Sequence, residues 1–221
     1  MKNQIFNFWS EMKMSDLEQD EIIHPKDKEI FQRITHSYAL KSLPLNFRGK
    51  LKTAKIVLLY LNPGYDKAND ERELKEFKEE YFKTIKGESP LKSKLINQGS
   101  YKWWKGRSNF LNLPEEWLID NLAILNIGAY HSKSFKDKGT LASLPSSRIA
   151  INWAQEVLFK EAEEGKRLVI CMRSSKFWGL KEGYQKGLLF SPKTTRGGHI
   201  LNGEVKDRIV KVAKKIHIRI S

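Results

Sequence analysis

The sharpest candidate for chemistry in this sequence is the segment Asn62-Pro63-Gly64, which Tyr65 follows directly. Proline has no backbone donor, and glycine lets a ligand approach the backbone closely. An asparagine placed before them could hold a water molecule or the edge of a nucleobase. An ordinary turn at the end of a strand uses the same residue types, so the tripeptide alone does not establish a site.

A second candidate segment runs from Asn126 to Ser132. The amide of Asn126 offers one donor group and one acceptor, a pair that can read one edge of a base. Tyr130 could stack on a ring, and His131 could act as acid, base or phosphate contact near neutral pH. The alternative is a buried asparagine satisfied by the backbone and a histidine at the surface.

Two further segments are basic. Arg173 and Ser174 stand where a predicted strand gives way to a helix, a position that suits an anion such as phosphate. Lys193, Arg196 and His199 lie in a glycine- and hydroxyl-rich segment that could approach a nucleic-acid backbone. For the first of these segments, the alternative is a capping serine beside a solvated arginine. The second lacks the Gly-Lys-Ser/Thr ending of a phosphate-binding loop.

The segment from Tyr101 to Arg107 mixes aromatic and cationic side chains, and it includes Trp103 and Trp104. Proteins that bind single-stranded nucleic acids combine these residue types. The same residues equally fit a loop that two tryptophans pin onto the core.

The whole chain has 221 residues and a formal net charge of +14, unevenly distributed. Residues 160–221 carry fifteen Lys and Arg against six Asp and Glu, whereas residues 1–30 carry four Lys against seven acidic residues. A basic surface favours polyanions, although a solvated lysine-rich face is an equal alternative. The single cysteine, Cys171, lies in an apolar run and predicts a buried, inert thiol. With no long apolar segment, we expect a cytoplasmic protein without membrane contact.

The elements that must position these residues alternate between strand and helix. Continuous apolar runs predict four strands at residues 55–61, 122–127, 167–172 and 188–190. Apolar residues recur at helical spacing over residues 30–38, 74–85, 149–158 and 205–216. This order predicts an α/β fold, one three-layer domain with a mostly parallel four-stranded central sheet flanked by helices. We expect residues 1–28 to form an acidic helix or arm and residues 29–221 to form the domain.

In parallel sheets, ligands bind beyond the carboxyl ends of the strands. All four candidate segments follow predicted strands, so we expect them to line a common cleft. The five histidines and one cysteine show no metal-ligand spacing, and we expect no metal and no cofactor.

Taken together, the segments resemble the uracil-DNA glycosylase superfamily. Members carry Gly-x-Asn-Pro-Gly or Gly-x-Asp-Pro after the first strand, where this chain reads Tyr60-Leu61-Asn62-Pro63-Gly64. They carry a base-reading asparagine on a later strand, where this chain has Asn126, and His-Pro-Ser after the last strand, where it has Ser191-Pro192-Lys193. It departs at Tyr60, where the family has glycine, and at Ser191, where the family has the histidine that stabilises charge on the leaving base. The chain also looks like a group of bacterial proteins with Leu-Asn-Pro-Gly, Tyr-His-Ser and Arg-Ser-x-x-x-Trp blocks.

The resemblance implies binding of DNA, or of a ligand that contains a nucleobase, with hydrolysis of an N-glycosidic bond if the site is active. If the site is active, Asn62 would position the attacking water. His131 would stabilise the departing base or serve as acid in place of the missing histidine, a role for which His199 is the other candidate. The implied base or ligand contacts are Pro63, Gly64, Tyr65, Asn126, Tyr130 and Ser132, and the implied phosphate contacts are Arg173, Ser174, Lys193, Arg196 and His199.

Two alternatives remain open. One is a catalytically silent nucleic-acid-binding module on the same fold, since the loss of His-Pro-Ser removes a catalytic group. The other is an enzyme or sensor for small nucleotides. Binding to long DNA with a steep salt dependence would favour the glycosylase-like protein or the silent binding module over the small-nucleotide enzyme or sensor.

Overall fold

The structure, a computed structural model, describes residues 2–65, 78–91, 98–133 and 138–220. The α-helices are α1 (Gln4–Trp9), α2 (Pro25–Phe31), α4 (Lys78–Ile85), α5 (Gln98–Ser108), α6 (Glu115–Asn121), α7 (Lys138–Leu141), α8 (Pro145–Trp153), α9 (Phe159–Glu163) and α10 (Glu204–Ile220). Short 3-10 turns are η1 (Met14–Glu18), η2 (Asn109–Leu111) and η4 (Ser175–Trp178), and a π-helical turn, η3 (Ala154–Leu158), joins α8 to α9.

Within the described residues, six strands form one mixed sheet. They are β1 (Phe47–Arg48), β2 (Ile56–Tyr60), β3 (Leu122–Asn126), β4 (Leu168–Cys171), β5 (Gln185–Lys186) and β6 (Leu189–Phe190). Their order is β1-β3-β2-β4-β6-β5, in which the four inner strands are parallel and the two edge strands are antiparallel to their neighbours. The α/β class is therefore confirmed, whereas the prediction of four strands is wrong. The two added strands have two residues each, too short to show an alternating pattern.

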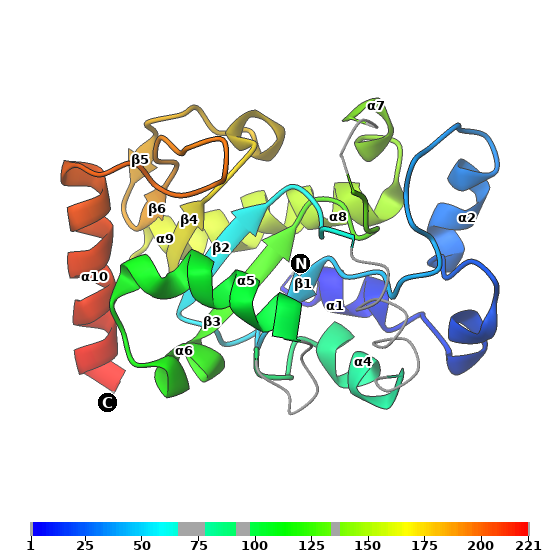
Figure 1. The fold of residues 1–221 in the computed structure, drawn as a ribbon, viewed down its shortest axis with the longest axis horizontal. Helices are drawn as coiled ribbons and strands as arrows, with labels where there is room; N and C mark the ends of the chain where they lie inside the picture. Colours follow the sequence, from blue (N-terminus) through cyan, green and yellow to red (C-terminus); the bar gives the residue numbers. More distant parts are fainter. Residues whose placement is uncertain (1, 66–77, 92–97, 134–137, 221) are drawn as a thin grey trace.

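Helices cover both faces of the sheet, because successive side chains of each inner strand point to opposite faces. On one face, Val57 and Leu59 pack in a cluster with residues of α1, α8 and α9. On the other face, Ile56, Leu58 and Tyr60 pack in a second cluster with residues of α5, α6 and α10. Figure 1 shows α5 and α6 in front of the sheet and α8 and α9 behind it. Both faces are apolar, which explains the continuous apolar runs.

The N-terminal residues contribute to the first of these clusters. Residues 1–28, expected to form a helix or an arm, contain α1, η1 and the start of α2. Ile5, Phe6 and Trp9 are buried in the cluster that also contains the sheet residues. The Trp9 indole nitrogen donates to the Asn46 side chain over 2.8 Å, which ties α1 to the residue before β1.

Two of the helical patterns in the sequence appear as predicted, one is described only in part, and one differs. The stripe from Ile149 to Leu158 forms α8 and η3, and the C-terminal stripe forms α10. The stripe over residues 30–38 is not one helix, because α2 ends at Phe31. The stripe that begins at Leu74 is described from Lys78 on, as α4, and its first residues lie outside the described part of the chain. Within the described residues, no helix has both the length and the apolar content needed to cross a bilayer.

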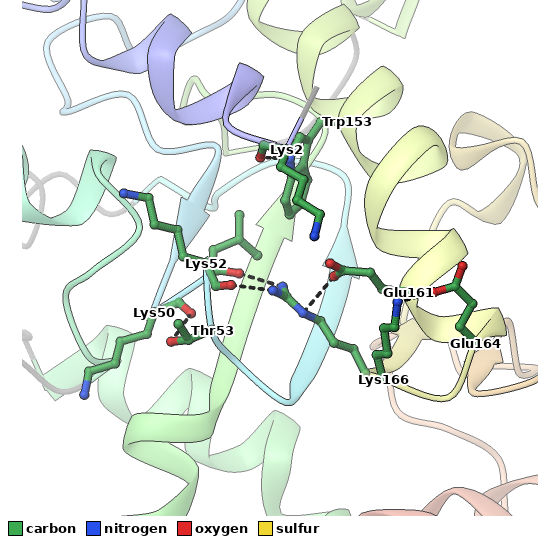
Figure 2. A network of polar contacts seen from close by, with 10 residues as sticks. Lys2, Lys50, Lys52, Thr53, Trp153, Glu161, Glu164 and Lys166 are labelled. Atoms are coloured by element: carbon green, nitrogen blue, oxygen red, sulfur yellow. Dashed lines mark hydrogen bonds and ion pairs between the residues drawn. The ribbon is translucent and has the colours of Figure 1, made fainter.

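An arginine at the amino end of the parallel strands fastens the segment that enters β2. The Arg167 guanidinium donates to the Leu51 carbonyl over 2.8 Å and to the Lys52 carbonyl, and it pairs with Glu161 of α9 over 2.9 Å (Figure 2). Burial lowers the pKa of Arg167, and Glu161 opposes that shift. All three groups belong to the protein itself, so this arginine has a structural role.

Candidate functional site

The four inner strands are parallel, so their carboxyl ends lie at one edge of the sheet. The segments after β2 and β3 continue side by side beyond the strands. The Ile127 amide donates to the Tyr60 carbonyl over 3.2 Å, and the Gly128 amide donates to the Leu61 carbonyl over 2.7 Å. Further along, Gly64 and Ser132 form a parallel bridge. The sheet thus brings the first two candidate segments together.

Asn62, His131 and Ser132 meet at this point. The Asn62 side-chain amide donates to the Ser132 hydroxyl over 2.8 Å and to the Pro63 carbonyl over 2.9 Å. His131 Nδ1 lies 2.8 Å from the Gly64 carbonyl. Asn62 is half-buried, whereas His131 is 4% exposed. The amide nitrogen of Asn62 therefore braces the two segments.

Asn126 and Tyr130 turn into the protein instead. The Asn126 amide donates to the Leu45 carbonyl over 3.3 Å, on the β1 side of β3. The Tyr130 ring is buried against Phe31, with ring centroids 4.7 Å apart. Its hydroxyl donates to the Asp27 carboxylate over 2.6 Å. Both side chains are engaged by groups of the protein itself.

A second cluster lies on the other face of the sheet, at the end of β2, under α5. The Trp103 ring lies over Tyr60, with ring centroids 4.9 Å apart and the planes inclined by 59°. Arg107, one helical turn further along α5, places its guanidinium carbon 5.9 Å from the Trp103 ring centroid, within the range of a cation–π interaction. Trp103 is 41% exposed, which is unusual for so large an apolar ring.

Arg173 approaches the same cluster from the end of β4. Its charge and that of Arg107 both act on the Tyr60 hydroxyl and oppose the rise that burial causes in the Tyr60 pKa. Gly198 lies against Arg173, since a Cβ atom at Gly198 would stand 3.2 Å from the Arg173 Cδ. We refer to Tyr60, Trp103, Arg107 and Arg173 as the Trp103 site.

The backbone next to Arg173 is strained. Ser174 adopts φ 62° and ψ 37°, a left-handed conformation that is uncommon for residues other than glycine. Such conformations cost free energy and gather at functional sites, because the surrounding structure must hold them in place. The strain fixes the direction in which the chain leaves β4 after Arg173.

The remaining predicted site residues are spread along this edge. Lys193, Arg196 and His199 are exposed in the segment after β6. Tyr65 is half-buried, and the Lys133 ammonium lies 5.8 Å from its ring centroid. Cys171 is buried, and burial raises its thiol pKa to about 12, so the thiol stays protonated near neutral pH.

Of the Trp103 site, the sequence analysis selected Arg173 as a phosphate contact and included Trp103 and Arg107 in the aromatic and cationic segment from Tyr101 to Arg107, but it did not select Tyr60. Two features pointed to it. Tyr60 replaces glycine in the first motif, and Trp103 and Arg107 stand four residues apart, so a helix places them on one face. The structure forms that helix as α5, where the sequence analysis considered a loop.

The part of the chain that the structure describes holds no group of three or more His, Cys, Asp or Glu side chains able to bind a metal ion. The likeness to uracil-DNA glycosylases remains a prediction from the motifs. No family model matches the chain, and neither a curated protein nor a solved structure matches it.

Proposed function

We propose that this protein binds single-stranded nucleic acid at the Trp103 site. The observation that carries the proposal is the exposed Trp103 ring, which packs on the Tyr60 ring and lies within cation–π range of the Arg107 guanidinium, with Arg173 nearby. An exposed aromatic ring can stack on a base, and neighbouring arginines can pair with the phosphates on either side. The net charge of +14 adds long-range attraction for a polyanion.

The site favours a single strand over a duplex. Stacking on Trp103 requires an open base face, and in a duplex each base face is covered by the next base pair. Lys193 and Arg196 are exposed cations in the segment that follows β6, and Gly198 of the same segment lies against Arg173. We expect these cations to add to the electrostatic attraction for a strand whose base stacks on Trp103.

The proposal is binding without base excision. In the glycosylase resemblance, Asn126 reads the base edge and Tyr130 is one of two candidates to stack on it. Here the Asn126 amide is held by the Leu45 carbonyl, and the Tyr130 hydroxyl is held by Asp27. His131, the implied acid, is 4% exposed and bonded to the Gly64 carbonyl. These contacts support the silent binding module rather than the glycosylase.

The direct test measures the affinity of the protein for a short oligothymidylate at several salt concentrations. We expect the logarithm of the association constant to fall linearly with the logarithm of salt, with a slope of about −1.4 or steeper, since at least two arginines replace counterions. A duplex of the same length serves as the control and should bind more weakly. Failure to retain the single strand at low salt would remove nucleic acid from the proposal.

A second assay separates binding from catalysis. The protein is incubated with a uracil-containing single strand, and free base is measured. We expect no release above the rate without protein. Release of uracil that depends on Asn62 would contradict the binding-only proposal and restore the glycosylase reading.

A further inference from the structure

Two donors in the Trp103 site lack an acceptor. The Tyr60 hydroxyl and the Nη1 atom of Arg107 are both buried, and neither has a hydrogen-bond partner among the described residues. Leaving a buried polar group unsatisfied is costly, so a native protein pairs nearly all of them with protein, water or a ligand. Tyr60 is 4% exposed, so its hydroxyl is part of the interior and not of a surface patch.

The charge at this place is positive. Arg107 and Arg173 both act on the Tyr60 hydroxyl, and neither takes part in an ion pair between described residues. Burial raises the Tyr60 pKa, which keeps the hydroxyl protonated and able to donate. Two unpaired donors and two positive charges therefore act at this place, and no carboxylate of the described residues pairs with either arginine.

We propose that Tyr60, Arg107 and Arg173 bind the oxygens of a phosphate dianion that ends a chain, with Trp103 stacked on the adjoining base. This inference rests on the proposed function. It specifies that the Trp103 site prefers a strand with a terminal phosphate. A terminal phosphate carries about −1.5 to −2 charges and three acceptor oxygens, which matches two guanidinium groups and one hydroxyl. An internal phosphodiester carries only one charge. It is also linked to a nucleotide on each side, so it cannot present three free oxygens to the Tyr60 hydroxyl and the two arginines.

The phosphate could come from the end of a strand or from a small molecule. The chemistry of recognition is the same in both cases, so the probes must separate the sources. We choose four probes: oligothymidylate with a 5′-phosphate, with a 3′-phosphate and with no terminal phosphate, and inorganic phosphate alone. Affinities are measured by calorimetry on the full chain at fixed ionic strength.

The informative variant is Tyr60→Phe, which removes the hydroxyl and keeps the ring that packs against Trp103. Arg107→Gln removes one of the two charges. The matched control is Lys211→Gln, which removes one positive charge from an exposed position on α10. Any general loss of electrostatic attraction will appear in the control as well.

We expect one of the phosphorylated strands to bind about tenfold more tightly than the unphosphorylated strand, the effect of one charge-assisted hydrogen bond network. Tyr60→Phe and Arg107→Gln should remove that preference, and Lys211→Gln should keep it. Inorganic phosphate that binds with the same dependence on Tyr60 would also support the site and would identify free phosphate as a source.

Equal binding of all three strands by the unaltered protein would overturn this inference and leave the proposed function standing. A preference for a phosphorylated strand that survives Tyr60→Phe and Arg107→Gln would also overturn it, because the phosphate would then bind elsewhere. Phosphate binding without any binding of strands would overturn the proposed function and keep the phosphate site.

Discussion

The Tyr130 hydroxyl donates a hydrogen bond of 2.6 Å to the Asp27 carboxylate, although 103 residues separate the two in the chain. The other carboxylate oxygen of Asp27 accepts from the Ser146 amide over 3.0 Å at the start of α8, and the His24 amide donates to the Tyr130 hydroxyl over 3.2 Å. Asp27 and Tyr130 are both almost fully buried. This network fixes α2 and α8 to the segment after β3 and leaves the Tyr130 side chain no role toward a ligand.

Tyr130→Phe should therefore reduce stability and leave ligand binding unchanged. Removal of the hydroxyl leaves a buried carboxylate short of one donor, which costs about 1 to 3 kcal/mol of the free energy of unfolding. Urea unfolding measures this change. Tyr65→Phe is the control, since Tyr65 is half-buried, and its effect should stay within about 0.5 kcal/mol. Equal effects of the two substitutions would show that the Asp27 contact contributes little.

His24 should make the protein less stable in mild acid. Its ring stacks on Phe8 at 3.8 Å, its Nε2 lies 2.8 Å from the Phe8 carbonyl, and its Nδ1 accepts from the Lys26 amide over 3.2 Å. The neutral ring satisfies both contacts, whereas a proton on Nδ1 would face the Lys26 amide hydrogen. Burial accordingly lowers the His24 pKa from its usual 6.5, although the Phe8 carbonyl and Asp27 oppose the shift.

Because the folded pKa of His24 is the lower one, the unfolded chain binds more protons below about pH 6.5. The free energy of unfolding should thus be at its full value above that pH and fall as the pH decreases, by at most about 1.4 kcal/mol per pH unit from this group. Urea unfolding at several pH values should show a shallower dependence for His24→Gln than for the unaltered protein. His199→Gln, at an exposed position, should keep the original dependence. An unchanged slope in His24→Gln would refute the assignment.

Arg167 should prove structural, in contrast to Arg107 and Arg173. Lysine at position 167 cannot reach the carbonyls of Leu51 and Lys52 together with Glu161, as the planar guanidinium does. Arg167→Lys should lower the free energy of unfolding by about 2 kcal/mol, because it leaves buried acceptors unsatisfied.

The control for this substitution is Lys166→Gln, which breaks an exposed pair with Glu164 and should change stability by less than about 1 kcal/mol. Oligonucleotide affinity should be unchanged in both variants, because both residues lie at the amino end of the strands. A loss of affinity in folded Arg167→Lys would indicate a ligand at the amino end of the strands and would contradict binding at the Trp103 site.

The sequence was sufficient to predict the inner sheet. Strands buried on both faces must be apolar throughout, and all four such runs became parallel inner strands. The edge strands β1 and β5 were not predictable, because two residues such as Phe47 and Arg48 show no periodicity and pair only once a neighbouring strand is in place. The end of α2 at Phe31 was also missed, since Tyr38 keeps helical spacing but packs against Phe31 and Tyr130 from a non-helical segment.

The sequence predicted the location of the candidate residues in the fold better than it predicted which side chains lie together there. The rule for parallel sheets predicts that the candidate segments meet beyond the carboxyl ends of the strands, and Asn62, Ser132 and His131 do meet there. The direction of a side chain depends on which face of a strand it occupies and on what packs above it. Tyr60 belongs to the first motif, but its contact with Trp103 depends on where α5 packs, and the sequence does not show that.

The measurement that tests the account most directly is the affinity of Trp103→Ala and Trp103→Phe for single-stranded oligothymidylate. Stacking of one base on an aromatic ring is worth about 1 to 3 kcal/mol, so Trp103→Ala should bind about tenfold more weakly or worse, while Trp103→Phe should retain most of the affinity. Thermal unfolding of both variants confirms that each is folded. If folded Trp103→Ala binds the strand as tightly as the unaltered protein, Trp103 is not the stacking platform and the central claim is contradicted.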